Sequence, residues 1–140
     1  MSSTRRSLLC GAVLLIGPRI ASAAPPPPLA PEQRWFEAAA AMKQLAESRG
    51  DQPYGAVLVG DGAVVGEGPS RVVALGDPSA HAEREAIRDA QRRLGRSDLA
   101  GSVLYSTSRP CRQCEIAAAE AHVARMFHGP ALNDAGQPRP

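Results

Sequence analysis

Two kinds of hydrophobic pattern follow one another between residues 32 and 65. Apolar residues recur at helical spacing from Glu32 to Arg49, which predicts a helix that ends in the stretch 50–53. The runs 56–59 and 63–65 are short and apolar, so each predicts a strand. Asp61-Gly62 lies between them and favours a tight hairpin turn, because glycine accepts a positive φ.

The rest of the chain alternates predicted helices and strands. Their ranges are 78–94 (helix), 103–105 (strand), 110–122 (helix) and 123–128 (strand). Asp77 is expected to cap the first of these helices, with Pro78 in its first turn. Residues 129–140 are rich in Pro and Gly and are expected to lack regular structure. The resulting order of elements indicates an α/β sheet with a hairpin at one edge.

Residues 1–23 have the features of an export signal peptide. Arg5 and Arg6 are followed by an apolar run over 8–16 and by the small-residue sequence 21–23. The stretch 3–9, which contains the paired arginines, resembles a twin-arginine signal. The apolar run is shorter than the roughly 20 residues that a membrane span needs. We therefore expect an exported protein with a periplasmic or extracellular location.

The expected domain boundaries follow from this leader. Four consecutive prolines at 25–28 favour a stiff, extended segment, so residues 24–31 are expected to form a spacer before a folded domain over 32–140. Cys10 follows Leu9, which is too large for the usual lipoprotein cleavage site. We therefore expect no membrane anchor after cleavage.

The charge of the chain changes when the leader is set aside. The whole sequence has 16 basic and 14 acidic residues, and its first 31 residues contain three arginines and no acid, so 13 basic and 14 acidic residues remain. A near-neutral domain gives no electrostatic support for binding a polyanion, so nucleic acid is not an expected partner. Aromatic residues make up 4% of the chain, which also argues against a broad stacking platform for single strands.

Three side chains downstream of the leader could bind one metal ion. Cys111 and Cys114 are three residues apart, so they share one face of a helix. They lie at a predicted helix start, where the macrodipole favours the thiolate, the form of cysteine that binds zinc. His81 would add a third donor and leave the fourth tetrahedral position open, as in catalytic zinc sites.

Glu83 is the candidate proton carrier beside this metal. A carboxylate next to water activated by a metal can take its proton and later give it to a leaving amine. Residues i and i+2 point apart inside a helix, so His81 and Glu83 can converge only in the first turn. Taken alone, the pair Cys111 and Cys114 is also compatible with a disulfide or a redox pair.

Together these residues match the H-x-E and P-C-x-x-C signature of zinc deaminases. The chain resembles the cytidine/deoxycytidylate deaminase superfamily, which includes guanine deaminases and tRNA adenosine deaminases. The resemblance runs from about Trp35 to Gly129. It is carried by the stretches 53–59, 65–68, 77–83 and 104–114, and the last two are highly specific.

The resemblance implies a fold, a cofactor and a site. The implied fold is the three-layer cytidine deaminase-like fold of the α/β class, with a mixed sheet, an N-terminal β-hairpin and flanking helices. Zinc is implied on His81, Cys111 and Cys114, with Glu83 as proton shuttle, and relatives are commonly dimers, so a homodimer is expected. The base edge is expected against the Gly55-Ala56 backbone. The full set of implied substrate contacts is Tyr54, Gly55, Ala56, Ser70 and Pro110.

The sequence departs from its relatives at three places. Relatives often have Asn where Ser70 stands. A serine reaches less far and has one fewer donor, so the mode of substrate binding seen in relatives does not carry over directly to this chain. Purine and tRNA relatives often have Glu where Arg109 stands. The chain also ends earlier than many relatives, so we expect an open pocket or one that a partner subunit completes.

These observations predict a zinc-dependent hydrolytic deaminase that acts on a nucleobase, a nucleoside or a similar small amino-heterocycle. One alternative is an exported, zinc-binding, deaminase-like protein without catalytic activity. Another is an exported thiol–disulfide protein that uses Cys111 and Cys114. A tRNA-editing enzyme is a third, and the export signal and near-neutral charge count against it.

Overall fold

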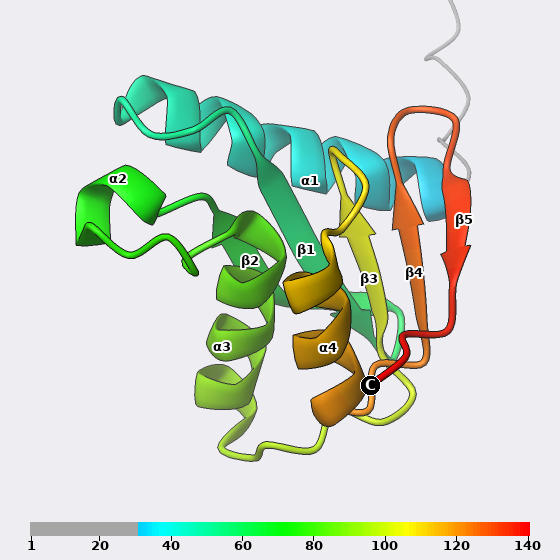
Figure 1. The fold of residues 1–140 in the computed structure, drawn as a ribbon. Helices are drawn as coiled ribbons and strands as arrows, with labels where there is room; N and C mark the ends of the chain where they lie inside the picture. The colour runs from blue at the N-terminus through cyan, green and yellow to red at the C-terminus, as the bar shows by residue number, and fades with distance from the viewer. Residues whose placement is uncertain (1–30) are drawn as a thin grey trace, which may run out of the picture.

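The computed structural model describes residues 31–140, which form a five-stranded sheet between two layers of helices (Figure 1). The predicted signal peptide and nearly all of the predicted spacer lie outside the described residues. No helix in the described range is long and apolar enough to cross a membrane. The elements in chain order are α1 (Pro31–Ser48), β1 (Gly55–Gly60), β2 (Ala63–Pro69), α2 (Val72–Leu75), α3 (Ala82–Leu94), β3 (Val103–Ser106), α4 (Arg112–Glu120), β4 (Arg125–His128) and β5 (Asn133–Gly136).

The sheet is mixed and has the order β2-β1-β3-β4-β5. β1 pairs antiparallel with both β2 and β3, β3 pairs parallel with β4, and β4 pairs antiparallel with β5. The predicted hairpin is confirmed at one edge, and its turn residues Asp61 and Gly62 have φ values of 49° and 73°. Two consecutive positive φ values are typical of the tight turn that follows the twist of a hairpin, and glycine adopts one of them without strain.

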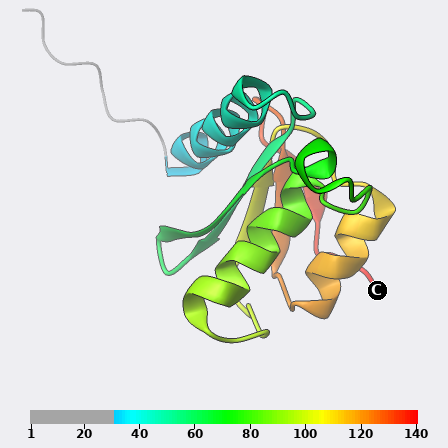
Figure 2. The same ribbon diagram turned by 90° about the vertical axis from the view of Figure 1, so that its left-hand side faces the viewer.

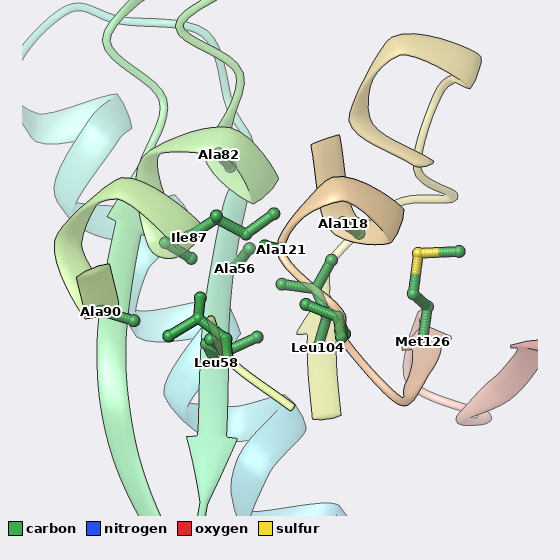
Figure 3. Close-up of a cluster of buried hydrophobic side chains, with 12 residues drawn as sticks. Ala56, Leu58, Ala82, Ile87, Ala90, Leu104, Ala118, Ala121 and Met126 are labelled. Atoms are coloured by element: carbon green, nitrogen blue, oxygen red, sulfur yellow. The ribbon is translucent and has the colours of Figure 1, made fainter. Parts of the chain in front are cut away.

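The core lies on both faces of the sheet. Along β1, Ala56 and Leu58 face α3 and α4, whereas Val57 and Val59 face α1, because successive side chains of a strand point to opposite faces. Figure 2 shows α1 on one side of the sheet and the pair α3 and α4 on the other. The cluster under α3 and α4 is drawn in Figure 3, and small alanines of both helices meet larger side chains of the strands there. The predicted three-layer fold is confirmed.

Helix α3 lies unusually close to β2, because two positions of that strand carry no side chain. A Cβ atom at Gly66 would be 2.2 Å from the carbonyl oxygen of Ala86. A Cβ atom at Gly68 would be 2.0 Å from the carbonyl oxygen of Ala82. The backbone of α3 therefore packs directly on the strand, which fixes the position of the first turn of the helix.

The predicted start of the second main helix was wrong. The sequence favoured a cap at Asp77, but α3 begins at Ala82 and the short helix α2 precedes it. Asp77 closes α2 instead: its backbone N–H donates to the carbonyl of Val72, and its carboxylate accepts from the amide of Ser79 at 2.8 Å. The turns after Asp77 delay the start of α3 by four residues relative to the prediction. The N-cap residue of α3 is therefore His81 and not Asp77.

The last predicted boundaries also change. α4 is shorter at each end than the predicted range 110–122, and β5 forms where residues 129–140 were expected to lack regular structure. Positive φ values at Gly129 and Leu132 reverse the chain, and β5 then pairs with β4. The tail after β5 lies along α4, where Arg139 donates to Glu115 and the carbonyls of residues 139 and 140 accept from Arg112.

Candidate metal centre

The three predicted metal donors lie at the beginnings of two neighbouring helices. His81 is the N-cap residue of α3 and Cys111 is the N-cap residue of α4. Both have extended backbone, with φ/ψ of −64°/152° and −73°/169°, and neither side chain makes a capping hydrogen bond. Cys114 follows within the first turn of α4 and is fully buried. The two helix starts therefore direct an imidazole and two sulfurs toward one point.

The distances between the donors fit a tetrahedral zinc ion. The Nδ1 atom of His81 lies 3.6 Å from the Sγ of Cys111 and 3.5 Å from the Sγ of Cys114, and the two sulfurs are 3.4 Å apart. With ordinary Zn–S and Zn–N bond lengths, neighbouring tetrahedral donors are separated by about 3.6 Å for S to N and about 3.8 Å for S to S. The donor set present therefore fits zinc.

The same distances argue against a disulfide in this state of the protein. A sulfur–sulfur bond is about 2.05 Å long, whereas the sulfurs of Cys111 and Cys114 are 3.4 Å apart and both residues are free thiols. Within residues 31–140, His81, Cys111 and Cys114 are the group of side chains that could hold a metal ion.

Glu83 lies beside these donors and away from water. Its side chain is 5% exposed, and its Oε2 atom accepts a hydrogen bond from the Cys114 thiol at 3.5 Å. His81 precedes α3 while Glu83 is its second residue, so the two side chains converge although they are separated by only two positions. The expected convergence of His81 and Glu83 is thus present. It arises because His81 is an N-cap residue with extended backbone rather than a residue of the first helical turn.

Burial shifts the pKa values of Glu83 and Cys114. Burial raises the pKa of Glu83, and its own backbone amide, the Cys114 thiol and the charge of His81 offset only part of this rise. Burial also raises the pKa of the Cys114 thiol, as do the charges of Glu83 and Cys111 nearby. A carboxyl group with a raised pKa holds a proton more readily than an ordinary one, which suits a group that must both accept and release a proton. A bound cation would favour the thiolate form of Cys114.

A cleft of about 300 Å³ opens onto the donors. Four of the predicted site residues line it: Tyr54, His81, Glu83 and Cys111. The side chain of Tyr54 is 44% exposed, so its ring is available to a ligand. The other lining residues are Gln52, Ala82, Ser108 and Arg109. The cleft therefore joins the buried carboxyl group to a rim formed by two loops.

Gly55, Ala56 and Pro110 were also predicted to contact substrate, and none of them is among the residues that line the cleft. The amide of Gly55 donates to the Oγ1 of Thr107, and the amide of Thr107 donates to the carbonyl of Gly55. Ala56 is fully buried under α3 and α4. Gly55 thus joins the two loops of the rim, and the contact of Gly55, Ala56 and Pro110 with substrate stays a prediction.

Ser70 has a structural partner in this fold. It is 3% exposed, does not line the cleft, and its hydroxyl donates to the carboxylate of Asp51 at 2.9 Å. The same carboxylate accepts from the amides of Gln52 and Ala74. Ser70 thus helps to hold the loop that carries Gln52 and Tyr54, and a direct contact with substrate stays a prediction.

Sequence reasoning did not select four of the cleft residues. Gln52 stands two positions before Tyr54, Ala82 lies between His81 and Glu83, and Ser108 stands two positions before Pro110. Arg109 was noted only as a departure from relatives. These residues stand beside motif residues in the sequence, and this was the only signal that could have selected them. The sequence does not show which of their side chains face the cleft.

Comparison with known proteins gives the family. Residues 30–129 match the model of the cytidine and deoxycytidylate deaminase zinc-binding region. A tRNA-specific adenosine deaminase of Agrobacterium fabrum is 38% identical over 101 residues, 72% of this chain and 66% of the relative. A guanine deaminase of Bacillus subtilis is 40% identical over 85 residues, 61% of this chain and 54% of the relative.

The solved structure of guanine deaminase from Bacillus subtilis has the same fold. It superposes with a TM-score of 0.66 at 35% identity and covers 69% of this chain and 62% of that one. The matched stretch spans about two thirds of the length of the first of these curated relatives and about half of the length of the second. The matched family region binds zinc, and the His81, Cys111 and Cys114 donors are suited to the same ion. The chain therefore belongs to the cytidine and deoxycytidylate deaminase family.

Proposed function

We propose that this protein is a zinc-dependent hydrolytic deaminase that acts on a nucleobase, a nucleoside or a similar small amino-heterocycle. The observation that carries the proposal is Glu83, a buried carboxyl group of raised pKa that lies 3.5 Å from the Sγ of Cys114 and lines an open cleft. A carboxyl group in this position is suited to proton transfer rather than to structure.

The roles of the residues follow from their placement. His81, Cys111 and Cys114 would hold zinc, which supplies a Lewis acid that makes water a stronger nucleophile. Glu83 accepts a proton from the attacking water and gives it to the amino nitrogen. One water is consumed, the C–N bond breaks, ammonia leaves and a carbonyl oxygen remains on the ring. Tyr54 offers an exposed ring at the cleft against which a heterocycle can stack.

The relatives support this reaction class. One is a tRNA-specific adenosine deaminase and another a guanine deaminase, so both act on an amino-substituted purine. For this chain we favour a small substrate over tRNA, because the sequence after residue 31 has 13 basic and 14 acidic residues. We also propose a homodimer, as expected for the family, which size-exclusion chromatography with light scattering would test.

The decisive experiment is ammonia release from a panel of bases, nucleosides and nucleotides by the zinc-loaded protein. Glu83→Gln keeps the size of the side chain, so we expect one zinc per chain and loss of turnover by about 100-fold or more. Glu120→Gln is the matched control, because Glu120 is exposed at the end of α4 and does not line the cleft. Normal turnover by Glu83→Gln would show that the role assigned to Glu83 is wrong.

The alternatives predict different results. A zinc-binding protein without activity would contain one zinc per chain and release no ammonia from any compound of the panel. A thiol–disulfide protein would contain no stoichiometric zinc, and its Cys111 and Cys114 thiols would cycle between reduced and oxidised forms. Metal analysis and thiol titration on the same sample separate these cases.

We further propose that the protein is exported by the twin-arginine route. The support is the sequence of residues 1–23, with Arg5 and Arg6 before an apolar run. Cell fractionation of the full chain should find the mature protein in the exported fraction. Replacement of both arginines by lysine should retain it in the cytoplasm, and an unchanged distribution would contradict this route.

A further inference from the structure

The residues that line the cleft contain one permanent cation. Of the eight lining side chains, Arg109 carries a guanidinium group and Glu83 a carboxyl group, and the others are neutral or serve as metal donors. Glu83 is nearly inaccessible to solvent, whereas Arg109 is exposed. The two charged groups thus occupy different parts of the cleft, the carboxyl group in its buried part and the guanidinium at its rim.

The backbone that carries Arg109 is anchored on both sides. Before it, the amide of Thr107 donates to the carbonyl of Gly55 at 2.9 Å, and the hydroxyl of Ser106 donates to the carbonyl of Ser108. After it, Pro110 restricts the backbone through its fixed φ, and α4 begins two residues later. The Cα of Arg109 is therefore held at the rim, and only its side chain remains adaptable.

No carboxylate among residues 31–140 forms an ion pair with Arg109, although several other arginines are paired. Arg112 contacts Glu115 and the backbone carbonyls of residues 139 and 140. Arg71 and Arg88 both contact Glu85. The donors of the Arg109 guanidinium are thus available to a ligand that enters the cleft.

We propose that Arg109 forms an anion-binding subsite, so that the preferred substrate is an amino-heterocycle that carries a phosphate or carboxylate group. This inference rests on the proposed deaminase function. A guanidinium presents parallel N–H donors that match the two oxygens of either anion. Two thiolates would neutralise a divalent ion at the donors, which leaves Arg109 as the permanent cation among the residues that line the cleft.

The dimensions of the cleft favour a small anionic substrate over a polymer. Its volume of about 300 Å³ is at the lower end of the roughly 300–1,000 Å³ typical of small-molecule sites. A ring whose amino group reaches Glu83 would extend its substituent toward the rim, where Arg109 lies. A nucleoside 5′-monophosphate and a base with a ring carboxylate share this chemistry, and matched substrates distinguish them.

The test compares substrates that differ only in their charge. Each nucleoside is paired with its 5′-monophosphate, and each base with its carboxylated analogue. We expect kcat/KM to be higher for the anionic member by about 10-fold to 100-fold, the range given by charge-assisted hydrogen bonds. Arg109→Gln should remove this preference by lowering kcat/KM for the anionic member to that of the neutral one, while Arg109→Lys should retain part of it.

Arg96→Gln is the matched control, because Arg96 is an exposed arginine that does not line this cleft. It should leave the preference intact. Titration calorimetry with the nucleoside monophosphate supplies a readout that does not depend on turnover, and Arg109→Gln should weaken this binding by about 10-fold. Binding that is unchanged in Arg109→Gln would overturn the subsite.

Failure of this inference and of the proposed function give different results. If neutral and anionic substrates are deaminated equally and Arg109→Gln changes nothing, the subsite is wrong and the deaminase function stands. If no compound is deaminated but nucleoside monophosphate binding depends on Arg109, the deaminase function is wrong and the anion site stands. A preference for an RNA stem-loop over every mononucleotide would overturn the small anionic substrate.

Discussion

A methyl group added at Gly68 tests whether the metal centre depends on the close approach of α3 to β2. In Gly68→Ala the new Cβ would be 2.0 Å from the carbonyl oxygen of Ala82 and 2.5 Å from the amide nitrogen of Ala86. An ordinary contact begins at 3.4 Å, so the first separation must open by about 1.4 Å. Both contacted atoms belong to the helix backbone, so no side-chain rotation relieves the overlap.

The magnitude of the effect follows from this displacement. Overpacking usually costs about 1–3 kcal/mol, and contact with a helix backbone places Gly68→Ala at the upper end of that range. In a domain of this size, about 3 kcal/mol corresponds to a decrease in Tm on the order of 10–15 °C. Ala82 lies between His81 and Glu83, so the displacement moves both. A misplacement of about 1 Å at a reacting group can lower turnover about 100-fold.

The assay measures Tm, zinc per chain and kcat for Gly68→Ala and for a control in the same hairpin. Gly60→Ala is suitable, because its Cβ would lie 3.6 Å from the methyl groups of Val65, an ordinary contact. The control should change the free energy of unfolding by less than about 1 kcal/mol and leave zinc and kcat unchanged. If Gly68→Ala behaves like this control, close packing of α3 on β2 does not position the site.

Three further predictions concern the metal, the loop and the cleft. Removal of zinc by a chelator should lower Tm and reduce the free energy of unfolding by about 3 kcal/mol or more, because the ion links two helix starts. An unchanged Tm in calorimetry would contradict this link. Burial alone would raise the pKa of Asp51, but hydrogen bonds from the amides of Ala74 and Gln52 and the hydroxyl of Ser70 hold it below its usual range. Its contribution to stability is therefore present above about pH 4 and is lost as pH falls through the lowered pKa. Asp51→Asn should thus be less stable than the wild type at neutral pH, and denaturant titrations should show this difference shrinking as the pH is lowered below about 4. Tyr54→Ala should raise KM about 10-fold with a smaller change in kcat, and Tyr54→Phe should not, because stacking on a base needs only the ring; equal KM values in steady-state kinetics would exclude such stacking.

The outer features of the fold are readable in the sequence because they depend on local patterns. The helical spacing over 32–49 predicted both ends of α1 to within one residue. The Asp61-Gly62 turn predicted the β1–β2 hairpin, because a tight turn depends on neighbours along the chain. The start of α3 was missed because Asp77 can either cap a helix or close a turn. Its neighbours in space, Val72 and Ser79, decide between these uses, and a linear pattern does not show that contact.

The grouping of the candidate metal donors was predictable for a related reason. Cys111 and Cys114 share a helix face by spacing alone, and His81 and Glu83 belong to a short motif. The rim of the cleft was not predictable, because it is formed by two loops that come together through the pairing of Gly55 with Thr107. The hydrogen bond from the Ser70 hydroxyl to the Asp51 carboxylate was not predictable either, because the two residues are 19 positions apart in the sequence.

The tail along α4 has a practical consequence for anyone who adds a purification tag or a reporter. Arg139 contacts Glu115, which follows Cys114, and the carbonyls of residues 139 and 140 contact Arg112, which lies between Cys111 and Cys114 in the sequence. A peptide fused after Pro140 would therefore emerge beside the helix that presents those sulfurs. The Asp61-Gly62 turn lies at the opposite end of β1 from the loop that lines the cleft, so an insertion there is better suited to labelling.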